Sequence, residues 1–141
     1  MQDRFRSSLP NAVVRLFRLI NRVHNRGLKP TGISAEQAHV LSLLWLFGPL
    51  TIGQLQRMLA LSSPTMTGAI DRMEAQELVR RVPSPDDGRA FLLEPLLPAK
   101  KRSQVESILE ADEQRCFSVL TGGERKELAR LLDKVISHLE A

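Results

Sequence analysis

The sequence contains no tyrosine, one tryptophan and a single cysteine, and these scarcities exclude several kinds of site. Without tyrosine, and with few other aromatic residues, the composition does not suit an aromatic ligand cage. The lone Cys116 excludes both an internal disulfide and a cysteine-rich zinc site. His24, His39 and His138 lie far apart and form no closely spaced ligand pair, so structural roles are favoured over metal binding.

The motifs of common enzyme classes are also missing. There is no Gly-x-Gly-x-x-Gly fingerprint, no phosphate-binding loop and no Gly-x-Ser-x-Gly nucleophile motif. We therefore expect no enzymatic activity, no cofactor and no metal. No apolar run approaches the roughly 20 residues that a helix needs to cross a bilayer, and no signal peptide is evident. We expect a cytoplasmic protein with no membrane partner.

Two short helical patterns follow one another in the middle of the chain. The first opens at Thr51, whose hydroxyl can accept from the backbone N–H of Gln54 while the Gln54 side chain reaches back, which is a capping box. The second opens at Ser62-Ser63-Pro64, because a hydroxyl can cap the free N–H groups and proline fits the first turn. We expect the second helix to run to Glu77.

The second helix has a narrow apolar face and a face of short polar side chains. The apolar positions are Met66, Ala69, Ile70 and Met73. The opposite side carries Ser63, Thr65, Thr67, Gly68, Asp71 and Arg72. A helix that enters the major groove of DNA needs such a face, because short side chains allow close approach and hydroxyls can bond phosphates or base edges. The pair also fits an ordinary hairpin of two helices, so it does not decide the function alone.

A predicted β-hairpin follows this helix pair. Residues 78–82 are β-prone, residues 83–88 are dense in turn formers, and residues 91–93 resume extended apolar character. Arg89 lies at the hairpin tip, where its guanidinium can reach an adjacent minor groove, and Asp87 can orient it. The order of elements is that of a helix-turn-helix followed by a wing.

As a set, these motifs resemble the MarR family of winged-helix transcription regulators, over nearly the whole chain. The resemblance rests on Ile33-Ser34-Ala35-Glu36-Gln37, on the run from Leu55 through Leu-Ser-Ser-Pro-Thr-Met-Thr, on Asp71-Arg72-Met73-Glu74, on Leu78-Val79-Arg80-Arg81 and on Asp87-x-Arg89. The sequence departs from the family pattern at Gly88, where members often carry a second arginine. It departs again at Leu96-Leu97-Pro98-Ala99-Lys100, and at Pro95, which we expect to interrupt the returning strand.

The resemblance implies a mainly α fold with a small β-hairpin wing in a single domain spanning 1–141. Residues 33–97 would form the winged-helix lobe that binds DNA, and residues 1–32 with 98–141 would form the dimerisation helices. It implies a homodimer on a palindromic operator, and a repressor released by a small aromatic or anionic effector, often a phenolic acid. The expected DNA-binding residues are Ser62, Ser63, Pro64, Thr65, Thr67, Gly68, Arg72, Asp87 and Arg89, with Arg72 meeting phosphate or pairing with Asp87. The alternative is a winged-helix interaction module that no longer binds DNA.

The flanking segments are helical and rich in apolar residues. We expect a helix from Asp3 to about Arg26 that ends at Gly27, a central helix over 34–47 that is apolar almost all round, and a long helix from about Pro98. A second capping box over 121–124 starts the last helix. Its apolar stripe comprises Leu128, Leu131, Leu132, Val135, Ile136 and Leu139. These stripes are wider than the lobe can cover, which favours a two-fold dimer.

A possible effector pocket would be lined by Phe17, His39, Trp45 and Phe47, although core packing explains these residues more simply. The positive charge is concentrated elsewhere. Residues 1–31 hold seven basic side chains and one acid, which leaves thirteen basic and fifteen acidic residues in the rest of the chain. Five of the seven share one helical face: Arg15, Arg18, Arg22, Arg26 and Lys29.

Four interpretations of this stripe remain open. The simplest is a solvated face paired with carboxylates of a neighbouring helix, such as Glu106, Glu110 or Glu113. An anionic effector site, a contact with the DNA backbone and a membrane-surface helix follow in that order.

Overall fold

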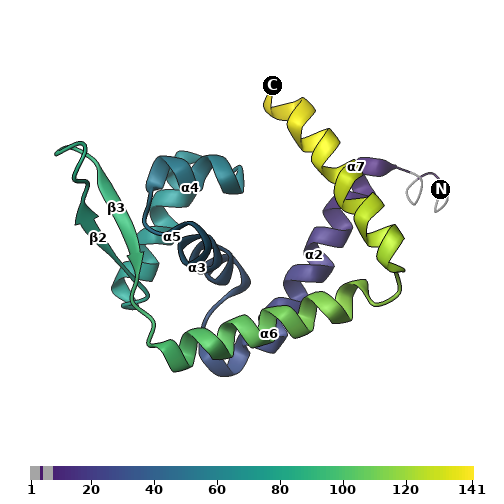
Figure 1. Ribbon diagram of the computed structural model, residues 1–141, viewed down its shortest axis with the longest axis horizontal. Helices are drawn as coiled ribbons and strands as arrows, with labels where there is room; N and C mark the ends of the chain where they lie inside the picture. The colour runs from purple at the N-terminus through teal and green to yellow at the C-terminus, as the bar shows by residue number, and fades with distance from the viewer. Residues whose placement is uncertain (1–3, 5–7) are drawn as a thin grey trace.

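The computed structural model describes residue 4 and residues 8–141, and it is mainly helical with one small sheet (Figure 1). The predicted start of the first helix at Asp3 lies outside the described residues. The elements are α2 (Leu9–Leu28), the short 3-10 helix η1 (Lys29–Thr31), α3 (Ala35–Phe47), β1 (Leu50–Thr51), α4 (Ile52–Leu59), α5 (Ser63–Ala75), β2 (Val79–Pro83), β3 (Phe91–Pro95), α6 (Ala99–Phe117) and α7 (Gly122–Glu140). No helix in the described part of the chain is long and apolar enough to cross a membrane.

The chain forms a lobe and an arm. In Figure 1 the lobe gathers α3, α4, α5 and the sheet, while α2 and α6 run side by side away from it towards α7. The N-terminal half of α2 and all of α7 lie at the far end of this arm. Their large apolar side chains are solvent-exposed in the single chain.

The core of the lobe is built around α3, as its nearly continuous apolar sequence predicts. A capping box between Ser34 and Gln37 starts this helix, and a glycine with positive φ, Gly48, ends it. Burial is not complete around the helix, because Leu46 and Phe47 at its C-terminal end are 73% and 57% exposed. Four of the remaining core side chains come from α5, and α2, β1, α4, β2, β3 and α6 contribute one each.

The sheet has three antiparallel strands in the order β1-β3-β2. The predicted hairpin is β2 and β3, with Arg81 opposite Leu93 at its middle. The third strand, β1, consists of two residues, and its Leu50 also pairs with Leu93. An isolated two-stranded hairpin is marginally stable, so the extra strand and the buried Leu93 fix the wing to the lobe.

Three predicted boundaries are wrong, and in one of them a tertiary contact prevailed over a local signal. Helix α2 continues through Gly27 to Leu28, since Gly27 lies against α6 and does not cap the helix. Helix α5 ends at Ala75, and Glu77 adopts a left-handed φ of 59°. Pro95 does not interrupt β3 but is its last residue, opposite Val79, where the missing N–H costs little.

Candidate nucleic-acid interface

Local hydrogen bonds start both helices of the predicted pair, α4 and α5. The predicted capping box is present, with the Gln54 N–H 3.1 Å from Thr51 Oγ1 and the Thr51 N–H 2.9 Å from Gln54 Oε1. After α4 the chain turns at Ala60, which has a left-handed φ of 52°, and Ser62 then caps α5. Leu55 of α4 is fully buried, so the helix pair is anchored to the lobe core.

Helix α5 presents the two faces that the sequence predicts. Its apolar residues, Met66, Ala69, Ile70 and Met73, are all buried. The candidate contact residues on its other side, Ser62, Ser63, Pro64, Thr65, Thr67 and Arg72, are exposed, and Gly68 is half-buried. The exposed side chains in the first two turns are no larger than threonine or proline, so they protrude little from the helix backbone.

The first turn of α5 also prepares a hydroxyl donor. The Ser62 hydroxyl donates to Thr65 Oγ1 over 2.8 Å, and Ser62 Oγ accepts from the Thr65 backbone N–H. Since the Thr65 oxygen is already accepting, its own proton is free to point outwards. A donor at this position can meet an acceptor on a base edge or a phosphate.

The wing tip is held by hydrogen bonds between residues that are close in sequence. Asp87 Oδ1 accepts from the Arg89 backbone N–H at 3.0 Å, so Asp87 orients the Arg89 backbone. The Ser84 N–H donates to the Ala90 carbonyl at 3.0 Å and closes the loop. Asp87, Gly88 and Arg89 are all exposed, which leaves the Arg89 guanidinium free to reach beyond α5.

An ion-pair cluster that the sequence did not predict braces α5 against the wing. Arg81 of β2 donates to Asp71 of α5, and its Nε lies 3.4 Å from Glu74 Oε2. The expected pairing of Arg72 with Asp87 is wrong, because Asp87 bonds the Arg89 backbone and no interaction joins it to Arg72 in the described chain. The signal that could have indicated the cluster was two acids three residues apart on one helix, followed by an arginine-containing strand.

The residues expected around an effector pocket are not brought together. His39 lines a hollow of about 260 Å³ between α2, α3 and α6. Trp45 lines another, of about 400 Å³, between α3 and α6, where the Arg102 guanidinium lies 5.2 Å from its ring centroid. Phe17 and Phe47 line neither hollow and are more than half exposed. The two hollows share Leu109 and Glu113, so they are neighbours along α6.

The smaller hollow contains a pair of histidines. The rings of His24 and His39 meet edge to face, with centroids 5.6 Å apart. Burial lowers the pKa of His39 below its ordinary value of 6.5, and His24 lowers it further, whereas Glu36 raises it. Two imidazoles in contact therefore favour the neutral form of His39 at this position.

The arginine stripe of α2 has no carboxylate partner in the described chain. Arg15, Arg18, Arg22, Arg26 and Lys29 are exposed, and none of them forms one of its ion pairs. Glu106, one of the carboxylates expected to pair with them, is bound instead by Arg102 on its own helix at 2.9 Å. Within a single chain, the expected pairing with α6 is therefore wrong. Among the described residues, no three His, Cys, Asp or Glu side chains gather as a possible metal site.

A helix-turn-helix followed by a sheet-anchored hairpin defines a winged-helix protein, and comparison with known proteins narrows the class. The sequence profile of the MarR family matches residues 33–91. The transcriptional regulator MgrA of Staphylococcus aureus is 32% identical over 120 residues, which cover 84% of this chain and 81% of MgrA. The chain belongs to the MarR family.

Solved structures agree on the fold. A mutant of MarR from E. coli complexed with operator DNA is 28% identical, covering 92% of this chain and 99% of that one, with a TM-score of 0.69. A probable transcriptional regulator from Pseudomonas aeruginosa shares the fold at 23% identity and a TM-score of 0.79, covering 93% and 98% of the two chains. The winged-helix lobe and the helical arm are thus both features of known relatives.

Proposed function

We propose that this protein is a sequence-specific DNA-binding transcriptional regulator. The observation that carries the proposal is the exposed polar face of α5, which begins with the Thr65 hydroxyl donor. The wing lies beside this face, and its tip carries the exposed Arg89. Such a helix fits the major groove, about 12 Å wide, while the wing reaches the adjacent minor groove. The relatedness to MarR, whose mutant was crystallised with operator DNA, supports the same conclusion.

The active form is proposed to be a homodimer joined through the far end of the arm. Large apolar side chains on α7 remain exposed, among them Val135 at 57% and Leu139 at 76%, and Leu9 of α2 is 79% exposed. Exposed apolar surface on this scale favours a partner, and a two-fold interface is the commonest solution. A two-fold dimer presents two α5 helices to two half-sites, so its operator is palindromic.

Repression released by an effector is the regulatory action that fits these features. A dimer bound to its operator blocks transcription by occupying the DNA, which requires no further surface. The two neighbouring hollows between the arm and the lobe suit a small ligand that changes the spacing of the two lobes. Three carboxylates, Glu106, Glu110 and Glu113, line the larger one against a single cation, Arg102, so we propose a neutral or cationic aromatic effector over an anionic one.

Binding to the DNA upstream of its own coding region tests this function. Fluorescence anisotropy at several salt concentrations would compare that DNA with a scrambled sequence of equal length. A DNA regulator binds the upstream DNA more tightly and shows a steep decrease in affinity with salt. No binding at low salt would favour the alternative, a winged-helix module that binds another protein and has lost DNA binding.

A variant of α5, the proposed recognition helix, sharpens the test. Thr65→Val keeps the side-chain shape and removes the hydroxyl, so it should cost about 1 to 3 kcal/mol on the preferred DNA and much less on the scrambled DNA. Ser107→Ala, an exposed hydroxyl removed from α6, is the matched control and should change neither affinity. Equal decreases in affinity on both DNAs for Thr65→Val would place this residue at a phosphate and not at a base.

A further inference from the structure

The basic stripe of α2 is an exposed row of cations that the single chain leaves uncompensated. It comprises Arg15, Arg18, Arg22 and Arg26 of α2 and continues to Lys29, the first residue of η1, and residues 8–31 contain no aspartate or glutamate. From Arg15 to Lys29 the stripe rises by 14 residue steps, or about 21 Å along the helix axis. Repulsion among five neighbouring cations destabilises such a surface slightly, and an anionic partner would relieve that repulsion.

The stripe lies on the face of α2 opposite the packed one. Ile20, Val23 and Gly27 are spaced to share one face, and the close contact of Gly27 with Asp112 shows that this face packs on α6. The exposed Val13 and Leu16 continue that face into the N-terminal half, where a second subunit would cover them. In the described chain no ion pair joins the stripe to a carboxylate of α6, and a subunit covering the apolar face would lie on the other side of α2.

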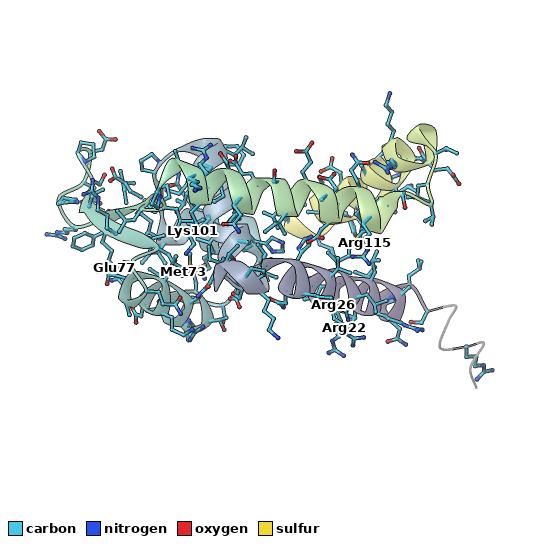
Figure 2. All side chains as sticks on the ribbon, turned by 90° about the horizontal axis from the view of Figure 1, so that it is seen from below. Arg22, Arg26, Met73, Glu77, Lys101 and Arg115 are labelled. Carbon is cyan, nitrogen blue, oxygen red and sulfur yellow. The ribbon has the colours of Figure 1, made fainter. Side chains whose placement is uncertain are left out.

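Figure 2 places the stripe on the same side of the molecule as the recognition helix. Arg22 and Arg26 project from α2 away from α6, whereas Arg115 lies between the two helices. Helix α5, located by its Met73 and by Glu77 just beyond its end, lies on the side towards which Arg22 and Arg26 point. Met73 lies on the buried face of α5. The exposed face of α5 therefore points away from the core, towards the side to which Arg22 and Arg26 also point.

We propose that the stripe is a second DNA contact that binds phosphates of the operator between the two half-sites. Helix α2 leads from the lobe, where Lys29 ends the stripe, to the exposed apolar end of the arm that joins the subunits. The cations of each subunit thus lie between its recognition helix and the two-fold axis. Along 21 Å of duplex each strand presents about six phosphates, which matches a row of five cations.

A small anionic ligand fits the stripe less well than DNA does. Ligand sites are concave, but four of these cations line none of the hollows described above, and only Arg26 borders a hollow, of about 150 Å³, with Gly27 and Asp112. An extended polyanion matches a straight row of exposed cations better than a compact anion does. The inference rests on the proposed DNA binding and extends it to a surface outside the helix-turn-helix and wing.

The test uses the full-length dimer and the double variant Arg18→Gln/Arg22→Gln on the upstream DNA and on scrambled DNA. Phosphate contacts carry no sequence information, so affinity should fall on both DNAs while their ratio stays within about twofold. The plot of log affinity against log salt should become shallower by about 0.9 for each phosphate that is no longer bound, up to about 3.6 for the four arginines of the dimer. Ethylation interference should disappear at phosphates between the half-sites.

Two further variants separate position from charge. Lys126→Gln/Lys134→Gln removes the same charge from α7, away from its apolar stripe, and should leave the salt slope unchanged. Arg18→Lys/Arg22→Lys keeps the charge and should retain the wild-type slope. Circular dichroism checks that every variant is folded.

Several results would overturn the proposal. One is an unchanged salt slope in the glutamine variant while the unmodified protein still prefers its upstream DNA. Another is dissociation of the glutamine variant into monomers by sedimentation, which would assign the stripe to the subunit interface. A third is loss of an anion-triggered release with the slope intact, which would assign the stripe to an effector. If the unmodified protein bound neither DNA, the proposed function itself would fail, and that outcome is distinct from the other three.

Discussion

Gly27 of α2 lies directly against the buried carboxylate of Asp112 in α6. A methyl group at residue 27 would come within 2.8 Å of Asp112 Oδ2 and 3.1 Å of Ile108 Cγ2. Asp112 is 8% exposed, and its Oδ2 accepts no hydrogen bond among the described residues. The absence of a side chain at residue 27 is what allows the two long helices of the arm to approach each other here.

We expect Gly27→Ala to destabilise the arm. Overpacking typically costs about 1 to 3 kcal/mol, and the better helix propensity of alanine returns about 1 kcal/mol, so a net decrease in stability should appear in urea unfolding. Gly123→Ala, where nothing lies within 4 Å of the added methyl group, is the control and should not destabilise the protein. Adding Asp112→Ala should recover much of the stability, and strictly additive effects of the two substitutions would show that the residues are not coupled.

The end of α5 offers a stabilising substitution. Glu77 holds a left-handed φ of 59° while the next N–H, that of Leu78, donates to the Met73 carbonyl at 2.9 Å. The left-handed region costs a residue with a side chain about 1 to 2 kcal/mol, and it costs glycine nothing comparable. Glu77→Gly should therefore raise the free energy of unfolding by about 1 kcal/mol, measured in urea. Ala75→Gly, two residues earlier in the regular helix, should lower it, and a decrease in both variants would contradict the expectation.

Subunit association should depend on the apolar face of α7. Leu132 is 40% exposed in the single chain, and complete burial of a leucine contributes about 1.5 to 3 kcal/mol. Leu132→Glu should give a monomer in analytical ultracentrifugation and lose DNA binding, because two half-sites can no longer be bound together. Lys134→Glu on the same helix controls for the added charge. A dimer that persists in Leu132→Glu would place the interface elsewhere.

Arg89 at the wing tip should contribute affinity without sequence discrimination. Arg89→Ala should weaken binding to different DNA sequences alike and lower the salt slope by about 0.9 per subunit, because one phosphate is no longer neutralised. Lys134→Ala provides a control cation far from the wing. Salt titrations on operator and scrambled DNA would measure both effects. If affinity and slope were unchanged, the wing would not contact DNA.

His39 should make stability depend on pH. Its pKa is lowered in the folded chain, first by burial and then by His24, so below pH 6.5 the unfolded chain binds a proton that the folded chain resists. The stability that neutral His39 contributes is complete above pH 6.5 and decreases as the pH falls from there towards the lowered pKa. His39→Gln should therefore show a smaller decrease in melting temperature than the wild type between pH 7.5 and pH 5.5. An equal decrease in both proteins would assign the effect to other groups.

Local chemistry explains which parts of the fold and the candidate site were predictable. The capping boxes at Thr51 and Thr121 link residues three apart, and both are present as predicted. The buried face of α5 follows in the same way from helical spacing. In contrast, the strand β1 consists of Leu50 and Thr51 and exists only because β3 pairs with it, so nothing in its own sequence distinguishes it from a loop.

The site shows the same division. Asp71 was expected on the exposed side of the recognition helix, but its partner Arg81 lies ten residues further along the chain, and only the packing of the wing on α5 brings them together. Trp45 and His39 belong to one helix and were both expected to line one pocket. The position of α6 instead gives each of them its own hollow.

The sequence by itself determined the elements of this protein, because caps, turns and helical periodicity act over three or four residues. It also determined that the cations of α2 share one face, since that follows from their spacing alone. Only the tertiary structure decided which other segments of the chain each helix face contacts. The apolar side of α2 packs on α6 at Gly27, and the arginine stripe lies on the same side of the molecule as the recognition helix. Such choices depend on contacts between distant segments, whose free energies come from burial and close packing and are not encoded by any one segment.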